Sequence, residues 1–388
     1  MTRLWLGALL VVGGCELIAD IPNATVGTRD GGSDAGPDAK PECLVPDECP
    51  TAEKPACDPL IHVCRACVDD GECPSDVCLP DGTCADSARF VYAAAGGIGT
   101  ACTLMTPCAL DTAVGKLTPT TDIVKMAPGT YVRGVTLSVA QSGFLAGAGS
   151  TFHVIADASP IIGISVTGGA HLAVLGLALA LDANADGVHC IGGMLELHRV
   201  HSTGGAQGIY ADGCGLTMRS TRIESAHYYA AYAHAAPVDI ANTYIVNNDT
   251  QPGYTLPALV LEDVPSGSIV HSTFAANTPG GVAGAIGCTN SANVAIRNII
   301  AANNTAPGIG AGCTVSSSVV DTGYVDGTAN MQLDPGFVDP TARNYHLSAT
   351  SPAKETGDPA VTLATDADGE PRPQPAATSP DPGADEIP

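Results

Sequence analysis

From residue 89 onward the chain consists of short apolar runs separated by Gly, Asn, Asp and Ser, and apolar residues recur in two registers. The first register runs through Val174, Leu197, Met218, Ile240, Val270, Ile296 and Val315. The second runs through Val188, Ile209, Ala231, Leu259, Ile286 and Ile309. Both repeat every 20–30 residues or so and keep step, which indicates coils of β-strands stacked as a parallel solenoid. A β-propeller competes, but it needs longer and more uniform blades.

Each coil should stack on the previous one at the strand spacing of about 4.8 Å. We therefore expect Val188, Ile209 and Leu259 to form an aliphatic ladder inside the solenoid. Asn242 and Asn298 follow the first register, where an asparagine can hydrogen-bond to its counterparts in neighbouring coils.

Motifs at both ends of this region carry a family resemblance. Phe90-Val91-Tyr92, the segment 109–117 and Ala127-Pro128-Gly129-Thr130-Tyr131 resemble the opening of pectate-lyase-like β-helix proteins. Asp334-Pro335-Gly336-Phe337, Asp366-x-Asp368-Gly369 and Gly383-Ala384-Asp385-Glu386 resemble the bacterial surface group called choice-of-anchor Q proteins. The resemblance implies an all-β, right-handed parallel β-helix, with a short helix carrying Leu110, Val114 and Leu117 as its N-terminal cap.

The first fifteen residues predict export and lipid anchoring. Arg3 precedes an apolar stretch, Leu4 to Val12, that is too short to span a bilayer permanently. It ends in Val12-Gly13-Gly14-Cys15, which resembles the lipobox of bacterial lipoproteins, where the cysteine is acylated. The alternative is an ordinary cleaved signal with an incidental cysteine. Glu16 after the cysteine favours an outer-membrane lipoprotein at the cell surface or periplasmic face.

The chain has 15 cysteines, and an even number remains after Cys15. In an exported chain this predicts disulfides. The candidates are Cys43, Cys49, Cys57, Cys64, Cys67, Cys73, Cys78, Cys84, Cys102, Cys108, Cys190, Cys214, Cys288 and Cys313. The first eight form two four-cysteine units whose connectivity stays open, and each later pair should be joined. The alternative is that these cysteines bind zinc, but a single Cys-x2-Cys pair, Cys64 and Cys67, has the spacing of zinc ligands.

These features divide the chain into five parts. They are a signal peptide at 1–15, a flexible linker at 16–42, a disulfide-rich module at 43–86, the capped β-helix at 87–345 and a segment at 346–388 that closes the solenoid. With 16 Lys+Arg against 40 Asp+Glu the net charge is −24, which argues against nucleic acid as a partner. We expect a monomer whose membrane contact is the N-terminal lipid.

The sequence predicts no catalytic residue and no cofactor. Asn184-Ala185-Asp186-Gly187 resembles a piece of polygalacturonase-like hydrolases, but the other motifs of that family are missing, and Asp186 and Asp212 should not stack. Asp182, Asn184 and Asp186 have the oxygen spacing of half a calcium loop, so they form a calcium candidate; a tight turn explains them equally. No other metal site is predicted.

Two outward columns suggest a glycan track. The first holds His189, Tyr210 and Tyr232, and the second includes His198, Arg219, His271 and Arg297. Rings could stack on sugars while Arg and His meet anionic groups; a merely solvated face is the alternative. We therefore predict a non-catalytic surface lipoprotein used for structure, adhesion or polysaccharide binding. The enzyme alternative is a polysaccharide lyase or glycoside hydrolase acting on acidic glycans.

Overall fold

The computed structural model describes residues 42–44, 48–49, 51, 53–57, 62–132, 135–137, 142–147, 149–154, 162–248, 255–280, 283–305, 307–321, 327–361, 363–376 and 378–388. The signal peptide, Cys15 and nearly all of the linker lie outside these residues. Residues 42–388 form one compact unit. No helix among the described residues has the length and apolar character needed to cross a membrane.

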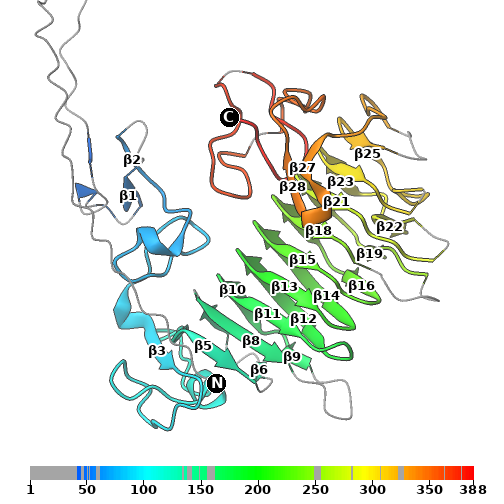
Figure 1. The fold of residues 1–388 in the computed structure, drawn as a ribbon. Helices are drawn as coiled ribbons and strands as arrows, with labels where there is room; N and C mark the ends of the chain where they lie inside the picture. The colour runs from blue at the N-terminus through cyan, green and yellow to red at the C-terminus, as the bar shows by residue number, and fades with distance from the viewer. Residues whose placement is uncertain are drawn as a thin grey trace, which may run out of the picture. The chain divides into compact units, whose positions relative to one another are not determined.

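Parallel strands stacked coil upon coil build most of this unit (Figure 1). The strands form three faces, here called sheets 1, 2 and 3, of which sheets 1 and 2 are continuous through two long strands, β12 (Asp186–His198) and β14 (Gln207–Arg219). The predicted all-β parallel β-helix is thus confirmed.

Sheet 1 contains the C-terminal halves of β12 and β14 together with β3 (Phe90–Ala93), β4 (Ile123–Met126), β7 (Gly143–Ala146), β10 (His171–Leu175), β17 (Val238–Ala241), β20 (Gly267–Val270), β23 (Val294–Arg297) and β25 (Val315–Ser316). Sheet 2 contains the N-terminal halves of β12 and β14 together with β6 (Val135–Leu137), β9 (Ile162–Thr167), β16 (Tyr229–His234), β19 (Leu259–Glu262) and β22 (Ile286–Thr289). Sheet 3 contains β5 (Gly129–Tyr131), β8 (Ser150–Val154), β11 (Ala178–Leu181), β13 (His201–Gly204), β15 (Arg222–Glu224), β18 (Tyr244–Val246), β21 (Thr273–Ala275), β24 (Ile300–Ala302) and β26 (Val319–Val320).

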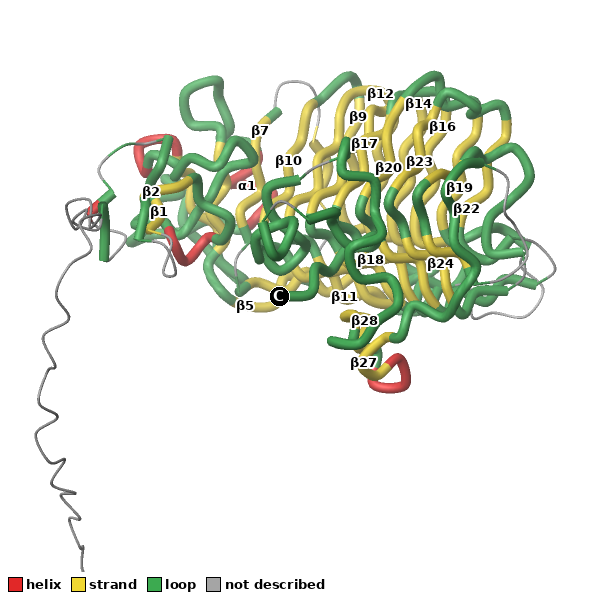
Figure 2. The backbone as a smooth tube through the Cα atoms, turned by 90° about the horizontal axis from the view of Figure 1, so that it is seen from above, coloured by secondary structure: helices red, strands yellow, loops and turns green. Residues whose placement is uncertain are grey.

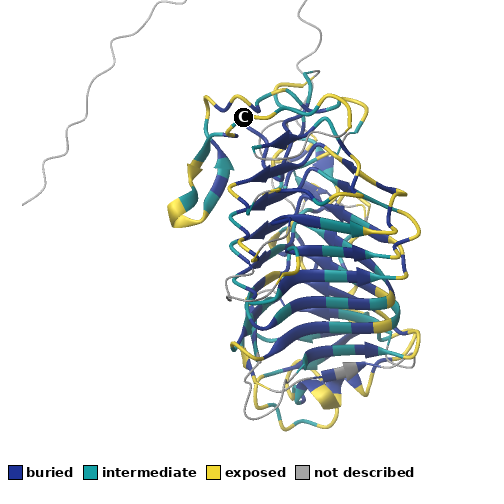
Figure 3. Ribbon diagram, turned by 90° about the vertical axis from the view of Figure 1, so that its right-hand side faces the viewer, coloured by how far each residue is buried: buried dark blue, intermediate teal, exposed yellow. Residues whose placement is uncertain are grey.

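Aliphatic ladders fill the interior, because every second residue of each strand points inward. The second sequence register is confirmed: Val188, Ile209, Ala231, Leu259, Ile286 and Ile309 are paired in succession across sheet 2. Figure 3 shows the resulting alternation of buried and more exposed positions along the strands. The core is one continuous apolar cluster, which α1 (Leu110–Val114) caps through Leu110 and Val114 as predicted.

The first register is correct except at one coil. Ile269, rather than Val270, pairs with Ile240 and Ile296 and points inward, so His271 falls one residue beyond the outward column. Ile269 and Val270 are both aliphatic, and alternation alone does not choose between them.

The residue that follows each sheet 1 strand turns the chain toward sheet 3. At this corner a left-handed backbone recurs, with φ of 50° at Asn242, 44° at His271 and 52° at Asn298. Asparagine and histidine tolerate this conformation better than most residues, which explains why they occur here. The expected asparagine ladder does not form at Asn242 and Asn298, since their side chains bond to carbonyls of the C-terminal segment. Asn298 Nδ2 also lies 3.2 Å from Nε2 of His271, which occupies the same corner of the preceding coil.

A buried asparagine ladder does exist, at the corner after sheet 3. The backbone N–H of Asn248 donates to Asn277 Oδ1, and that of Asn277 donates to Asn304 Oδ1, both at 3.0 Å. The carboxamides also donate to carbonyls of the preceding coil, so the polar groups of three coils satisfy one another.

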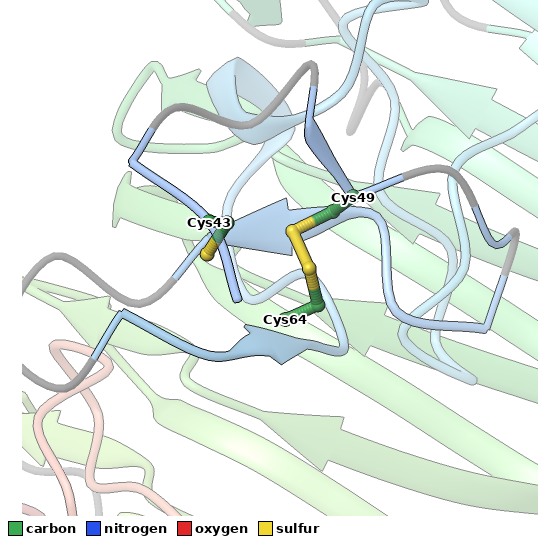
Figure 4. A group of neighbouring side chains, drawn as sticks. All are labelled: Cys43, Cys49 and Cys64. Atoms are coloured by element: carbon green, nitrogen blue, oxygen red, sulfur yellow. A yellow bond between two sulfur atoms is a disulfide. The ribbon is translucent and has the colours of Figure 1, made fainter. Parts of the chain in front are cut away.

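The fourteen cysteines of the described residues form seven disulfides. In the module the first cysteine of each unit joins the third and the second joins the fourth: Cys43–Cys57, Cys49–Cys64, Cys67–Cys78 and Cys73–Cys84. Figure 4 shows the bond between Cys49 and Cys64. The others are Cys102–Cys108, Cys190–Cys214 and Cys288–Cys313. The module's own regular structure is the antiparallel pair β1 (Ala56–Cys57) and β2 (Cys64–Arg65) with a 3-10 turn, Asp70–Glu72.

The module packs on the outer face of the first coils of sheet 1. Val77 and Leu79 contact Phe90 and Leu175 in one apolar cluster. Beside it, Arg199 Nη2 lies 3.0 Å from Asp70 Oδ1 and donates to the carbonyl of Cys78. The module therefore covers a face that sequence reasoning left open to solvent.

The C-terminal segment lies along the outer face of sheet 3, beside β18 and β24 (Figure 2). It begins with the antiparallel pair β27 (Phe337–Asp339) and β28 (Asn344–Leu347), which are joined by the 3-10 turn Pro340–Ala342. Outward apolar side chains of sheet 3, such as Val246 and Ile300, pack against Tyr345, Leu347 and other residues of the segment. The segment thus extends the core outside the coils.

Candidate binding face on sheet 2

An aromatic column runs along the outer face of sheet 2. The strand register pairs His189 with Tyr210 and Tyr210 with Tyr232, as the sequence predicts. The ring centroids of His189 and Tyr210 lie 5.1 Å apart, and those of Tyr210 and Tyr232 lie 5.2 Å apart with nearly parallel planes. Because the rings face one another along the stack, the column presents ring edges and hydroxyls to solvent.

A second row borders the start of these strands. Asp186, Gln207 and Tyr229 are paired across the same three coils. Asp186 Oδ2 lies 3.2 Å from His189 Nε2, and the Tyr229 ring lies 5.8 Å from that of Tyr232. The second row thus contacts the aromatic column at both ends.

Carboxylates border the other side of the column. The Tyr232 hydroxyl donates to Glu262 Oε2 at 2.5 Å. His234 lies between two acids, with Nδ1 2.6 Å from Asp212 Oδ1 and Nε2 3.6 Å from Asp263 Oδ2. The hydrogen bond to Asp212 and the negative charges nearby raise the pKa of His234, which therefore holds its proton to higher pH than a free imidazole.

The tyrosines of the face are hydrogen-bond donors at physiological pH. Burial, followed by nearby carboxylates, raises the pKa of Tyr210, and burial with the bond to Glu262 raises that of Tyr232. The phenols stay neutral, and the carboxylates accept. The face therefore offers alternating donors and acceptors beside aromatic edges, which suits the hydroxyl groups of sugars.

A disulfide holds the coils beneath this face together. Cys190 and Cys214 are offset in register, since Cys190 pairs with Ala211 and Cys214 with Gly193. The chain bends at Gly193, with φ of 119°, and the Cα atoms of the two cysteines come within 5.9 Å. The pairing predicted from the sequence is thus present, and the bend lies where sheet 2 turns into sheet 1.

The second predicted column does not form a cationic stripe. His198 is buried and bonds to Glu196, and Arg219 forms an ion pair with Asp239. His271 was placed in the column by the misaligned register; Val270 occupies that position, and His271 is completely buried beneath the C-terminal segment. Arg297 is exposed on sheet 1. His198, Arg219 and Arg297 therefore keep the predicted column, but burial and ion pairing leave no continuous row of free cations among them.

The calcium candidate also separates into different contacts. Asp182 Oδ1 lies 3.1 Å from His153 Nε2, whereas Asp186 turns toward His189. Asn184 is exposed in the turn between them. Each carboxylate thus has an imidazole partner.

The two carboxylates considered from the sequence, Asp186 and Asp212, do not have the spacing of a glycosidase pair, as expected. Asp186 pairs with Gln207, whereas Asp212 pairs with Ile191, so five strand positions or roughly 16 Å separate the two columns. Glycosidases need carboxyl groups about 5–10 Å apart. The carboxyls whose pKa burial raises most, Asp385 to about 6 and Glu386 to about 7, are instead buried in the C-terminal segment.

Fold and site together define a disulfide-rich parallel β-helix with an aromatic and acidic outer face. No protein-family model matches the chain, and no curated protein matches it. Among solved structures it is similar to one described as the crystal structure of pectate lyase Pel9A, at 14% identity and a TM-score of 0.48. That match covers 77% of this chain and 96% of the other, and at this level it carries no inference about activity.

Proposed function

We propose that this protein is an exported, surface-anchored polysaccharide-binding protein without catalytic activity, and that the outer face of sheet 2 is its binding face. The observation that carries the proposal is the stacked column of His189, Tyr210 and Tyr232, bordered by carboxylates. Successive coils repeat at about 4.8 Å, close to the length of a sugar unit, so an extended glycan can contact several coils in turn.

The ligand we propose is a neutral, hydroxyl-rich polysaccharide. The residues named on this face include Asp186, Asp212, Glu262 and Asp263 but neither lysine nor arginine, and the whole chain carries a charge of −24. A polyanion would be repelled by this field. The sequence-based expectation of anionic glycans depended on a stripe in which Arg219 is ion-paired and His271 is buried.

Export and anchoring belong to the same proposal. The apolar leader that ends at Cys15 supports lipidation, and the seven disulfides fit an oxidising compartment. The resemblance of the C-terminal motifs to choice-of-anchor Q proteins points to the same location. Membrane release of a Cys15→Ser variant would support the anchor, and unchanged membrane partitioning would contradict it.

The binding proposal is tested by affinity electrophoresis against a panel of neutral and acidic polysaccharides. Wild type should be retarded by at least one neutral polymer, at low and high salt alike, without releasing shortened sugars. Tyr210→Ala/Tyr232→Ala should lose the retardation. Val338→Ala is the control, because Val338 is an exposed apolar residue of β27, outside sheet 2. Retardation confined to acidic polymers, or release of products, would overturn the proposal.

A further inference from the structure

One imidazole and two carboxylates meet within the C-terminal segment, far from the binding face in sequence. His346 on β28 places Nε2 2.9 Å from Asp368 Oδ2 and 4.0 Å from Asp385 Oδ1. The three candidate ligand atoms all lie within 4.8 Å of one another. A cation with bonds of about 2.0–2.2 Å to nitrogen and oxygen fits such a triangle with small side-chain shifts.

Neighbouring groups orient two of the three side chains toward a common point. His346 Nδ1 lies 2.6 Å from Asn344 Oδ1, so Nδ1 is the protonated donor and Nε2 faces the carboxylates. Asp385 Oδ2 accepts the backbone N–H of Leu347 at 2.7 Å, which directs Oδ1 toward His346. Histidines that bind metals are usually held by such a bond from the other ring nitrogen.

A buried hydroxyl without a partner is the second observation. Tyr244 on β18 is 7% exposed, and its hydroxyl makes no hydrogen bond among the described residues. The ring lies 6.2 Å from that of His346 and packs against Ala384, next to Asp385. Burial, followed by the negative charges of Asp385, Asp368 and Asp366, raises the pKa of Tyr244. A metal-bound water would give this hydroxyl the acceptor that it lacks.

We propose that His346, Asp368 and Asp385 bind a first-row divalent cation of the Zn²⁺ type. One imidazole with two carboxylates suits such ions, whereas Ca²⁺ and Mg²⁺ prefer oxygen ligands alone. The ion would join β28, the turn at Asp366–Asp368 and the C-terminal residues, three pieces that cover sheet 3. It would therefore hold the three pieces of the segment together, with Tyr244 of β18 reached through a bound water, independently of glycan binding on sheet 2.

The test is zinc titration of the full chain without an affinity tag, after chelator treatment. All proteins carry Cys15→Ser, so that no free thiol takes up zinc. Wild type should bind about one Zn²⁺ per chain, with Ca²⁺ at least tenfold weaker. Asp368→Asn should weaken zinc binding by at least about tenfold, as lost metal-site partners do. Zinc should also raise the melting temperature of wild type but not of Asp368→Asn.

The matched control is His171→Ala, because His171 is half exposed and bonds to Glu196 at 2.7 Å, much as His346 bonds to Asp368. It should bind zinc like wild type. Asp368 is about half exposed, so Asp368→Asn should fold, and an unchanged melting temperature without metal verifies this. Wild type that takes up no zinc, or equal affinity in wild type and Asp368→Asn, would overturn the proposal.

Discussion

The outer faces of sheets 2 and 3 share one set of coils but differ in what covers them. In the later coils of sheet 3 outward apolar residues, such as Val246, Ile300 and Val319, are buried by the C-terminal segment. On sheet 2 the outward residues are aromatic and ionisable, and Tyr210, Tyr232 and His234 remain partly exposed. Since the inner ladders are alike, the difference arises outside the coils.

We expect the covered face of sheet 3 to contribute mainly to stability and the open face of sheet 2 mainly to binding. Sheet 3 and its cover form an additional core, with a buried ion pair between Arg372 and Glu386 at its centre. Sheet 2 instead keeps its polar groups in contact with each other and with solvent. Changes under the cover of sheet 3 should therefore alter folding, whereas changes to outward residues of sheet 2 should alter binding with little effect on folding.

The largest effect should follow removal of Arg372, which is fully buried with Glu386 at 3.4 Å. Arg372→Met leaves a buried acid without its cation, and should lower the free energy of unfolding by about 3–5 kcal/mol. Denaturant unfolding measures the loss. Adding Glu386→Gln should restore much of the lost free energy of unfolding. A double variant as unstable as Arg372→Met would show that the unpaired acid does not cause the loss.

Breaking the bridge under the binding face should cost somewhat less. Cys190→Ser/Cys214→Ser opens a loop of sequence separation 24 and should lower the free energy of unfolding by about 3 kcal/mol. Thermal unfolding checks this. Glycan retardation of the folded variant should be weakened too, because the coils that carry Tyr210 and His189 lose their link. Unchanged stability would contradict the role given to the disulfide.

In acid, the contribution of His271 to the stability of the covered face should decrease. Burial and the neighbouring Arg372 lower the pKa of His271 to about 4. In the neutral ring Nε2 donates to the carbonyl of Val361, and Nδ1 accepts from Arg372 Nη1. Above pH 6.5 the His271 imidazole is neutral in both the folded and the unfolded protein. Between pH 6.5 and 4 only the unfolded chain takes up this proton, so the contribution of His271 to the free energy of unfolding falls by about 2–3 kcal/mol. The raised pKa values of Asp385 and Glu386 act in the opposite direction.

His271→Asn is the variant that isolates this contribution, since asparagine already occupies the same corner at positions 242 and 298. We compare the change in the free energy of unfolding between pH 6.5 and pH 4 in the two proteins. This change should be about 2–3 kcal/mol less unfavourable in His271→Asn than in wild type. Parallel pH curves for the two proteins would exclude His271 as the cause.

The smallest effect on stability should come from Tyr232→Phe on sheet 2. The variant removes the hydrogen bond to Glu262 but keeps the ring stack, so unfolding should change by no more than about 1 kcal/mol. Binding of the neutral glycan should weaken more visibly, because a donor and an ordered acceptor are lost together. A loss of stability as large as that of Arg372→Met would erase the distinction between the two faces.

Sequence periodicity was sufficient for the coils and for the aromatic column, because alternation fixes which residues share a face. It was insufficient at Ile269 and Val270, where two aliphatic neighbours leave the register open, and His271 was misplaced as a result. It also could not show that Leu175 lies under the module or that Arg372 pairs with Glu386. Those contacts join segments far apart in the chain, and no repeat records them.

The metal-ligating group was missed for the same reason. His346, Asp368 and Asp385 lie in three separate pieces of the C-terminal segment, with spacing that matches no metal motif. The signal that could have helped is the density of carboxylates in a stretch that also has to be buried. Asp366 and Asp385 are both buried there.

The central claim is that the aromatic column on sheet 2 binds a neutral polysaccharide. The most direct measurement is calorimetric titration of one such polymer into wild type and into Tyr210→Ala/Tyr232→Ala, with unfolding curves for both. We predict binding by wild type, an affinity at least about tenfold lower in the double variant, equivalent to about 1.4 kcal/mol, and unchanged folding of the solenoid. Equal affinity in the two proteins, or sugar cleavage by wild type during the titration, would contradict the claim.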